Sequence, residues 1–234
     1  TDLQDAERAT ETTTAITRLT ARGANRVVVC FDVDKATQYE SQFKRIAFDN
    51  YPRHLLGAVP MLFASELAED ISPSRRGWTA LVNSFLHPAM ESFLYNAENR
   101  LREYRTKNPL LIFRNDGDAS RVAKTIALKT YSSGPRGGME GVKEFSKQYK
   151  LPNVVSMDIG GTTTDIGHIV NHTVQESRHG NVEGVPISFG LCEIASPGVG
   201  GSSILSVNGK DIKVGPESVG AVPGPASFGR GGKE

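Results

Sequence analysis

The residues best suited to chemistry lie in one stretch, which reads V-V-S-M-D-I-G-G-T-T-T-D-I-G over residues 154–167. An apolar strand leads to Asp158, and Gly160 and Gly161 then permit a turn whose backbone amides can face an anion at close range. Three hydroxyl groups stand beside this turn, and Asp165 begins the returning strand; the hydroxyls belong to Thr162, Thr163 and Thr164. A carboxylate near a phosphate can hold Mg²⁺, directly or through water. The pattern therefore predicts a phosphate-binding hairpin, and a plain hairpin with a threonine-rich turn is the alternative.

A second glycine-rich turn contains Gly198, Gly200 and Gly201 and precedes an apolar strand. It could pass close to a nucleotide or a substrate, or it could be an ordinary loop. A third glycine-rich segment, residues 133–138, precedes a predicted helix, and helix N-termini attract anions. Its Arg136 could reach a phosphate or a carboxylate, although a solvated arginine is the favoured interpretation.

Hydrophobic patterns predict the elements that must position these turns. Helices are expected over residues 1–22, 36–48, 139–149 and, briefly, from Asp118. Strands are expected over residues 26–31, 58–63, 110–113, 153–157, 166–170 and 173–176, with a hairpin over 203–214. Ser72 and Pro73 should begin a long helix that Pro88 kinks. Strands alternating with helices indicate an α/β fold with parallel pairing.

Composition narrows the class of protein. The 27 basic and 26 acidic residues among 234 leave a net charge of +1, which removes the electrostatic case for nucleic acid or an anionic membrane. No apolar run approaches the roughly 18 residues that span a bilayer, and no signal-peptide core is present. Cys30 and Cys192 are too far apart in sequence for a zinc motif, so we expect two buried thiols in a cytoplasmic protein. The chain opens at Thr1, and we expect it to be a segment of a longer protein.

The hairpin D-I-G-G-T-T-T-D resembles the phosphate hairpin of the actin-like ATPase superfamily. Four motifs occurring in order narrow the resemblance to the hydantoinase A/oxoprolinase family: S-S-G-P-R-G-G (132–138), the hairpin (158–165), G-V-G-G-S-S-I (198–204) and a Gly/Pro-rich motif over 214–232. The family includes N-methylhydantoinase, 5-oxoproline hydrolase and subunits of acetone and acetophenone carboxylase. The resemblance implies an actin-like ATPase (ribonuclease H-like) domain over residues 73–234, with its hairpin at 154–170 and a tail at 215–234. Residues 1–72 would be the rear part of the preceding α/β domain.

The resemblance also implies an activity: ATP hydrolysis coupled to opening of a cyclic amide or to carboxylation of a ketone. ATP and Mg²⁺ are the implied cofactors, and a small-molecule substrate and a larger hydantoinase B-like subunit are the implied partners. Asp158 would serve the Mg²⁺ water shell, and Asp165 would orient a hydroxyl or a water, or simply close the turn. The other predicted binding residues would contact phosphate or nucleotide; they are Gly160, Gly161, Thr162, Thr163, Thr164, Gly198, Gly200 and Gly201.

The sequence departs from the family pattern at three places, and two alternative functions remain open. Glu193-Ile194-Ala195 replaces an Asp-x-His, Ser202 replaces a third glycine, and Arg136 replaces a small residue. The lost imidazole puts a substrate or metal role there in doubt. A nucleotide-dependent switch or assembly subunit and a small-molecule kinase are the alternatives, since these functions share one scaffold.

Overall fold

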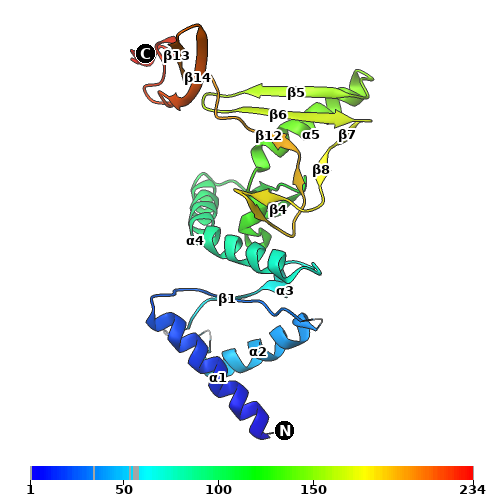
Figure 1. Ribbon diagram of the computed structural model, residues 1–234, viewed down its shortest axis with the longest axis vertical. Coiled ribbons are helices and arrows are strands. Elements are labelled where there is room, and N and C mark those ends of the chain that lie inside the picture. Colours follow the sequence, from blue (N-terminus) through cyan, green and yellow to red (C-terminus); the bar gives the residue numbers. More distant parts are fainter. Residues whose placement is uncertain (1, 34, 53, 55–57, 234) are drawn as a thin grey trace. The chain divides into compact units, whose positions relative to one another are not determined.

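The computed structural model of the chain describes residues 2–33, 35–52, 54 and 58–233. The helices are α1 (Asp2–Ala21), α2 (Ala36–Asn50), α3 (Ala64–Leu67), α4 (Pro73–Glu103) and α5 (Ser133–Gln148), with short 3-10 turns at η1 (Val122–Lys124), η2 (Ala127–Thr130) and η3 (Ala226–Phe228) (Figure 1). The strands up to the hairpin are β1 (Val27–Val29), β2 (Met61–Phe63), β3 (Leu111–Phe113), β4 (Ala119–Arg121), β5 (Val154–Ile159) and β6 (Thr164–Val170). Those that follow are β7 (Thr173–Val174), β8 (Glu176–Ser177), β9 (Asn181–Val182), β10 (Val185–Pro186), β11 (Leu191–Cys192), β12 (Ile194–Ala195), β13 (Ser203–Asn208) and β14 (Asp211–Ser218). This mixture of helices and strands confirms the predicted α/β class.

The chain forms two compact units. The first comprises residues 1–112, 120–131 and 178–190, and the second comprises residues 113–119, 132–177 and 191–234. Among the described residues no helix is long and apolar enough to cross a membrane.

The first unit is built on a pair of parallel strands. β1 pairs with β2 so that Val27 lies opposite Met61 and Val29 opposite Phe63. Val27, Val29 and Phe63 form its buried core, against which partly buried side chains pack; these are Phe31, Phe43, Phe48, Val59 and Met61. Pro60 stays outside the ladder, where its missing N–H costs nothing and its carbonyl accepts a hydrogen bond from the Val27 amide at 2.9 Å.

The long helix α4 begins as its sequence predicts. Ser72 Oγ accepts a hydrogen bond from the Arg75 amide at 3.3 Å, and Pro73 is the first helical residue, which confirms both assignments. Pro88 lies inside the helix. Figure 1 shows α4 changing direction along its length, as expected where proline removes a backbone donor.

The second unit contains the predicted hairpin. β6 lies between β5 and β12 in an antiparallel sheet, and β7 also pairs with β6. One face of this sheet packs on α5 through a core of Met139, Ile169 and Val174. Figure 1 shows α5 running along that face of β5 and β6. β5 is an edge strand, and its opposite face is exposed at Val155, Met157 and Ile159.

Two predicted elements differ in the structure. The segment from Asp118 forms the strand β4 and the turn η1 rather than a helix, because Asp118 does not act as a cap and its carboxylate instead pairs with Arg114. Helix α5 begins at Ser133 rather than near residue 139. Pro135 falls in the first turn, where the backbone N–H has no helical partner in any case, so proline does not prevent helix formation there.

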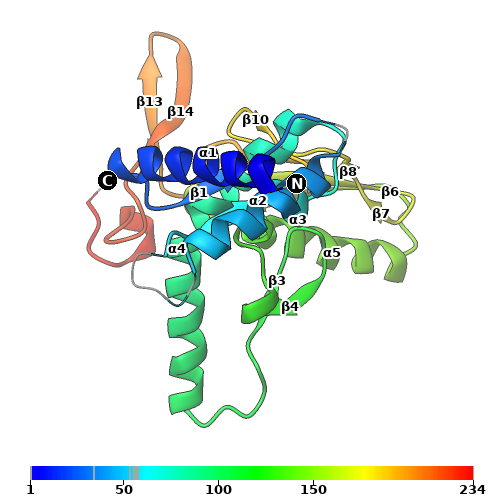
Figure 2. The same ribbon diagram turned by 90° about the horizontal axis from the view of Figure 1, so that it is seen from below.

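The Gly/Pro-rich tail is more regular than its composition predicts. Strand β14 continues past Gly215 and Pro216 to Ser218, and its register with β13 shifts there. Leu205 lies opposite Val214 and Ser203 lies opposite Ser218, so residues 215–217 form an irregularity in the ladder where a proline is tolerated. Figure 2 shows β13 and β14 as a two-stranded arm. The predicted hairpin is present, but its turn lies one residue further along than expected. Asn208 is the last residue of β13 and pairs with Asp211, so Gly209 and Lys210 form the loop, and Gly209 has a positive φ of 65°.

Candidate functional site

The site is built around the turn that joins β5 to β6. The turn closes through the Gly160 amide, which donates to the Thr163 carbonyl at 2.9 Å. Residues 158–163 are all exposed. Within the described part of the chain, no acceptor takes the amides of Gly161, Thr162 or Thr163. Three successive exposed amides are therefore available to an anion.

The second glycine-rich turn packs directly on the first and explains how those amides are oriented. The Gly201 amide donates to the Gly160 carbonyl at 2.9 Å, and the Ser202 amide donates to the Gly161 carbonyl at 2.7 Å. In a trans peptide the C=O and the following N–H point in opposite directions. Because both carbonyls point to the second turn, the amides of Gly161 and Thr162 point away from it.

Close approach of the two turns depends on one glycine in particular. A Cβ at Gly200 would lie 2.7 Å from the Gly160 carbonyl oxygen and 2.8 Å from the Gly161 carbonyl carbon. A Cβ at Gly198 or Gly161 would meet nothing within 4 Å. The lack of a side chain is thus a steric requirement at Gly200, whereas a Cβ at Gly161 would enter open space.

Thr164 and Ser202 lock the two turns together. Thr164 is buried, and its Oγ1 donates to the Val199 carbonyl at 2.6 Å while its amide donates to the Pro197 carbonyl at 3.2 Å. The Ser202 hydroxyl, only 2% exposed, donates to the Gly161 carbonyl, so this carbonyl accepts two hydrogen bonds. Sequence reasoning did not select Ser202 as a site residue; its one signal was a hydroxyl at a position where the family often has glycine.

The two candidate catalytic carboxylates are direct neighbours. Asp158 lies opposite Asp165 in the β5–β6 register. Side chains of such a cross-strand pair share one face, with Cβ atoms about 4.5–5.5 Å apart. The Ser196 hydroxyl donates to Asp165 Oδ1 at 2.6 Å, whereas Asp158 is exposed. By alternation along each strand, both carboxylates lie on the same sheet face as Val154 and Ile169, the face that α5 covers further along.

This donor set fits a cation that brings much of its own coordination shell. No cluster of three or more His, Cys, Asp or Glu side chains that could hold a metal occurs among the described residues. Mg²⁺ typically binds through one or two carboxylates, completed by phosphate oxygens and water. Asp158 and Asp165 match that requirement, and Asp158 is the freer of the two.

Arg136 is not solvated, which corrects the expectation from the sequence. Its side chain is 5% exposed. Its guanidinium donates to Glu140 Oε1, at 3.0 Å from Nε and 2.7 Å from Nη2, and Nη1 pairs with Glu176. Burial opposes the charged form, but the hydrogen bonds to Glu140 and Glu176 outweigh it and raise the pKa of Arg136. The residue joins α5 to β8, and its donors are not directed to the phosphate turn.

The Glu193–Ala195 departure is divided between the two sheet faces: Glu193 and Ala195 are exposed, whereas Ile194 packs against the core that α5 covers. Ile194 and Ala195 form β12 and pair with Gly167 and Ile166 of β6. Glu193 is exposed and accepts a hydrogen bond from the Ser177 hydroxyl at 3.2 Å. These residues border an open hollow of about 530 Å³ that Val155 and His168 also line.

The fold resembles two solved structures. The first is the nucleotide-free structure of acetone carboxylase, an enzyme of ATP-dependent acetone carboxylation. The superposition covers 89% of this chain and 30% of the acetone carboxylase chain, with a TM-score of 0.74 and 21% sequence identity. The ATP-dependent caprolactamase of Pseudomonas jessenii superposes on 94% of this chain and 32% of its own, with a TM-score of 0.69 and 23% identity. The chain therefore has the α/β fold that these two structures share.

Sequence comparison gives the family. The profile of the Hydantoinase/oxoprolinase family matches residues 76–234, and this chain belongs to that family. The acetophenone carboxylase gamma subunit of Aromatoleum aromaticum is 28% identical over 225 residues, which cover 94% of this chain and 31% of that protein. 5-Oxoprolinase 1 of Arabidopsis thaliana is 28% identical over 194 residues, which cover 78% of this chain and 15% of that protein. The chain therefore spans a third or less of the length of these relatives.

Proposed function

We propose that this chain is the ATP-binding part of an enzyme that couples ATP hydrolysis to the opening of a cyclic amide or to the carboxylation of a ketone. The observation that carries the proposal is the turn at 160–163, whose Gly161 and Thr162 amides have no acceptor and point away from the second turn. Converging amides in a glycine-rich turn suit the β- and γ-phosphates of a nucleotide. Relatives named as a carboxylase, an oxoprolinase and an ATP-dependent caprolactamase support the reaction class.

The residues of the two turns have different proposed roles, which follow from their positions. The exposed hydroxyls of Thr162 and Thr163 stand beside the free amides, whereas the Thr164 hydroxyl is already donated to Val199. The amides of Gly201 and Ser202 hold the Gly160 and Gly161 carbonyls, and the absence of a side chain at Gly200 allows this approach, so the peptide planes are set before ATP arrives. Such preorganisation is the main source of catalysis in phosphoryl transfer.

Mg²⁺ would neutralise phosphate charge and orient the terminal phosphoryl group. Asp158 would hold it through its water shell, and Asp165, fixed by Ser196, would orient a hydroxyl or a water next to it. Transfer of the phosphoryl group to a carbonyl oxygen of the substrate would turn that oxygen into a leaving group. We further propose a larger partner subunit, since two relatives are named as single subunits of a carboxylase and of a caprolactamase, and a cytoplasmic location where ATP is supplied.

Calorimetric titration of the 234-residue chain with Mg-ATP tests the proposal. Gly161→Val is the blocking variant: a Cβ there meets nothing within 4 Å, so the turn should keep its fold, and we expect the added side chain to hinder an anion at the Gly161 and Thr162 amides. Gly141→Val is the matched control on α5, where a Cβ also meets nothing within 4 Å. We expect saturable binding in the wild type and the control, and none in Gly161→Val. Absence of binding in the wild type, or equal binding in both variants, contradicts the proposed site.

Phosphate release separates an enzyme from a nucleotide-dependent switch. In the presence of the proposed partner subunit, an enzyme of this class should release phosphate faster than its basal rate when a cyclic amide, or a ketone together with bicarbonate, is added. Turnover that stays at its basal rate with every such compound would favour the switch.

A further inference from the structure

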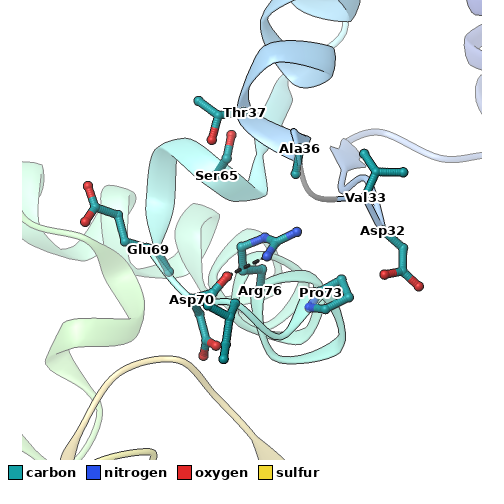
Figure 3. Close-up of a pocket in the computed structure, with 11 residues that line it drawn as sticks. Asp32, Val33, Ala36, Thr37, Ser65, Glu69, Asp70, Pro73 and Arg76 are labelled. Atoms are coloured by element: carbon teal, nitrogen blue, oxygen red, sulfur yellow. Dashed lines mark hydrogen bonds between the residues drawn. The ribbon is translucent and has the colours of Figure 1, made fainter.

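A polar cavity lies in the first unit, whereas the phosphate turn belongs to the second unit. It has a volume of about 580 Å³ and opens where the parallel strands β1 and β2 end. The carboxyl ends of parallel strands are where α/β proteins commonly bind ligands. Its walls come from the segment after β1, the first turns of α2 and α4, and the segment after β2 (Figure 3).

Arg76 supplies a buried positive charge to this cavity. Arg76 is only 6% exposed, and Figure 3 shows its guanidinium between the start of α2 and Pro73. Nη2 donates to the Phe31 carbonyl at 2.8 Å and Nη1 donates to the Asp70 carbonyl, so two of the five N–H groups of a guanidinium are used. Nε is buried and has no hydrogen-bond partner. No ion pair to Arg76 forms among the described residues.

The helix α2 adds a second attraction for anions at the same place. Ala36 and Thr37 of its first turn line the cavity. The helix has no side-chain cap and no acidic residue in its first turn. Among the described residues no acceptor takes the Thr37 amide. The described residues of α2 and its cap therefore place no negative charge at the positive end of this 15-residue helix, next to Arg76.

Carboxylates near the cavity do not compensate this charge. The Asp70 carboxylate forms two hydrogen bonds with Arg75, at 2.7 and 2.8 Å, and one with the Ser72 amide. Buried Glu40 accepts from the Phe31 amide and from the amide and hydroxyl of Ser65, and so fixes the walls without pairing with Arg76. Asp32 and Glu69 are exposed at the rim, where water screens them.

We propose that this cavity binds the oxyanion of a small molecule, a carboxylate or a phosphate, between Arg76 and the first turn of α2. A buried guanidinium whose donors are only partly used, facing a helix N-terminus, offers charge-assisted hydrogen bonds to an anion. The inference is independent of the ATP site, because all residues involved belong to the first unit and the phosphate turn belongs to the second.

The proposal is tested by titrating the 234-residue chain with propionate and, separately, with inorganic phosphate. Binding is monitored by NMR through the signals of the Thr37 amide and the Arg76 Nε–H. These two signals report on the cavity, whereas the Gly161 and Thr162 amides report on the phosphate turn. We expect saturable shifts at Thr37 and Arg76 with a dissociation constant of about 1 mM or lower. The tighter of the two anions identifies the class of ligand.

Thr37→Glu is the decisive variant. An acid in the first turn favours the helix, so the protein should stay folded while the new carboxylate occupies the anion position. Thr37→Gln is its neutral isostere. We expect Thr37→Glu to weaken binding at least about tenfold and Thr37→Gln to change it about twofold or less. Arg76→Lys, which keeps the charge but loses the planar fork, should also weaken binding.

Two results would overturn the inference: no saturable shift at Thr37 and Arg76 with either anion, or binding that Thr37→Glu leaves intact. Shifts confined to Gly161 and Thr162 count among the overturning results, because they would assign the anion to the phosphate turn alone.

Discussion

Asp158 and Asp165 face each other as a like-charged cross-strand pair. Opposed like charges destabilise a sheet unless a cation lies between them or near them. A pair of this kind, next to a turn with free amides, is costly for folding and useful for holding a cation against phosphate. Removal of one of these two charges should therefore change the stability of the protein and its binding of Mg-ATP in opposite directions.

Asp158→Asn should leave the thermal unfolding temperature in the absence of ligand unchanged or slightly raised, because it removes the repulsion with Asp165. The same variant should lose most of the stabilisation that Mg-ATP gives the wild type, because it lacks the carboxylate that we propose to hold Mg²⁺. Thermal melts with and without Mg-ATP measure both effects, with Asp211→Asn in the β13–β14 hairpin as control. A full response to Mg-ATP in Asp158→Asn would remove this carboxylate from the site.

Cys192 gives a prediction about pH. Burial raises the pKa of Cys192 to about 11, so its thiolate is scarce at neutral pH. In a Cys30→Ser background, which removes the exposed thiol, iodoacetamide should modify the native protein roughly a hundredfold more slowly than the urea-unfolded chain at pH 8. The native rate should rise with pH up to about 11. Equal rates for native and unfolded protein would mean that the thiol is neither buried nor raised in pKa.

At the scale of elements, the contact between the two glycine-rich turns orients the peptide planes of the proposed phosphate site. Gly200→Ala should push the turns apart, since its Cβ would lie 2.7 Å from the Gly160 oxygen, and should cost about 1–3 kcal/mol of unfolding free energy. It should also weaken Mg-ATP binding, because the peptide planes of Gly160 and Gly161 are no longer held.

Gly198→Ala is the matched control for that variant, as its Cβ meets nothing within 4 Å. Urea unfolding and nucleotide titration of the pair provide the measurement. If the two alanine variants behave alike, close packing of the turns has no role in the site.

Arg136 tests the connection between α5 and β8. Arg136→Met removes the guanidinium from Glu140 and Glu176 and should cost about 1–3 kcal/mol, since both carboxylates lose a charged donor. Arg100→Met, at a side chain that is 68% exposed, should change stability by less than about 0.5 kcal/mol. Mg-ATP affinity, measured at a temperature where both variants are folded, should be unaltered in each. A selective loss of affinity in Arg136→Met would show that this arginine reaches the phosphates.

At the scale of the whole molecule, the second unit has an apolar sheet face that the described residues leave uncovered. Val155, Met157 and Ile159 are 74%, 61% and 65% exposed, and they lie on the edge strand β5. Exposed apolar edge strands promote association of chains. This property matters for every binding experiment, because association would compete with ligand at high protein concentration.

Met157→Lys should lower light scattering of concentrated protein and leave the unfolding free energy within about 0.5 kcal/mol of the wild type. Ser92→Lys, which makes the same charge change on an exposed position of α4, is the control. If both variants reduce scattering equally, net charge rather than the β5 face governs association.

The sequence by itself determined the elements whose signals are local. The cap at Ser72, the glycine turn at Gly209 and the strand that carries Asp158 follow from backbone preferences and short-range periodicity, which neighbouring residues in the chain specify. The family likewise follows from motifs that stand in order along the chain, and the profile match over residues 76–234 confirms it.

The tertiary structure decided what depends on residues distant in sequence. Arg136 is buried because Glu176, 40 positions away, pairs with its charge, and β14 accommodates Pro216 because the register with β13 shifts at that point. The orientation of the Gly161 and Thr162 amides depends on donors at Gly201 and Ser202, about 40 residues further on. The cavity beside Arg76 likewise forms from the ends of two strands and the starts of two helices. A local pattern contains no record of such partners, since hydrogen bonds and burial are set by which segments meet in space.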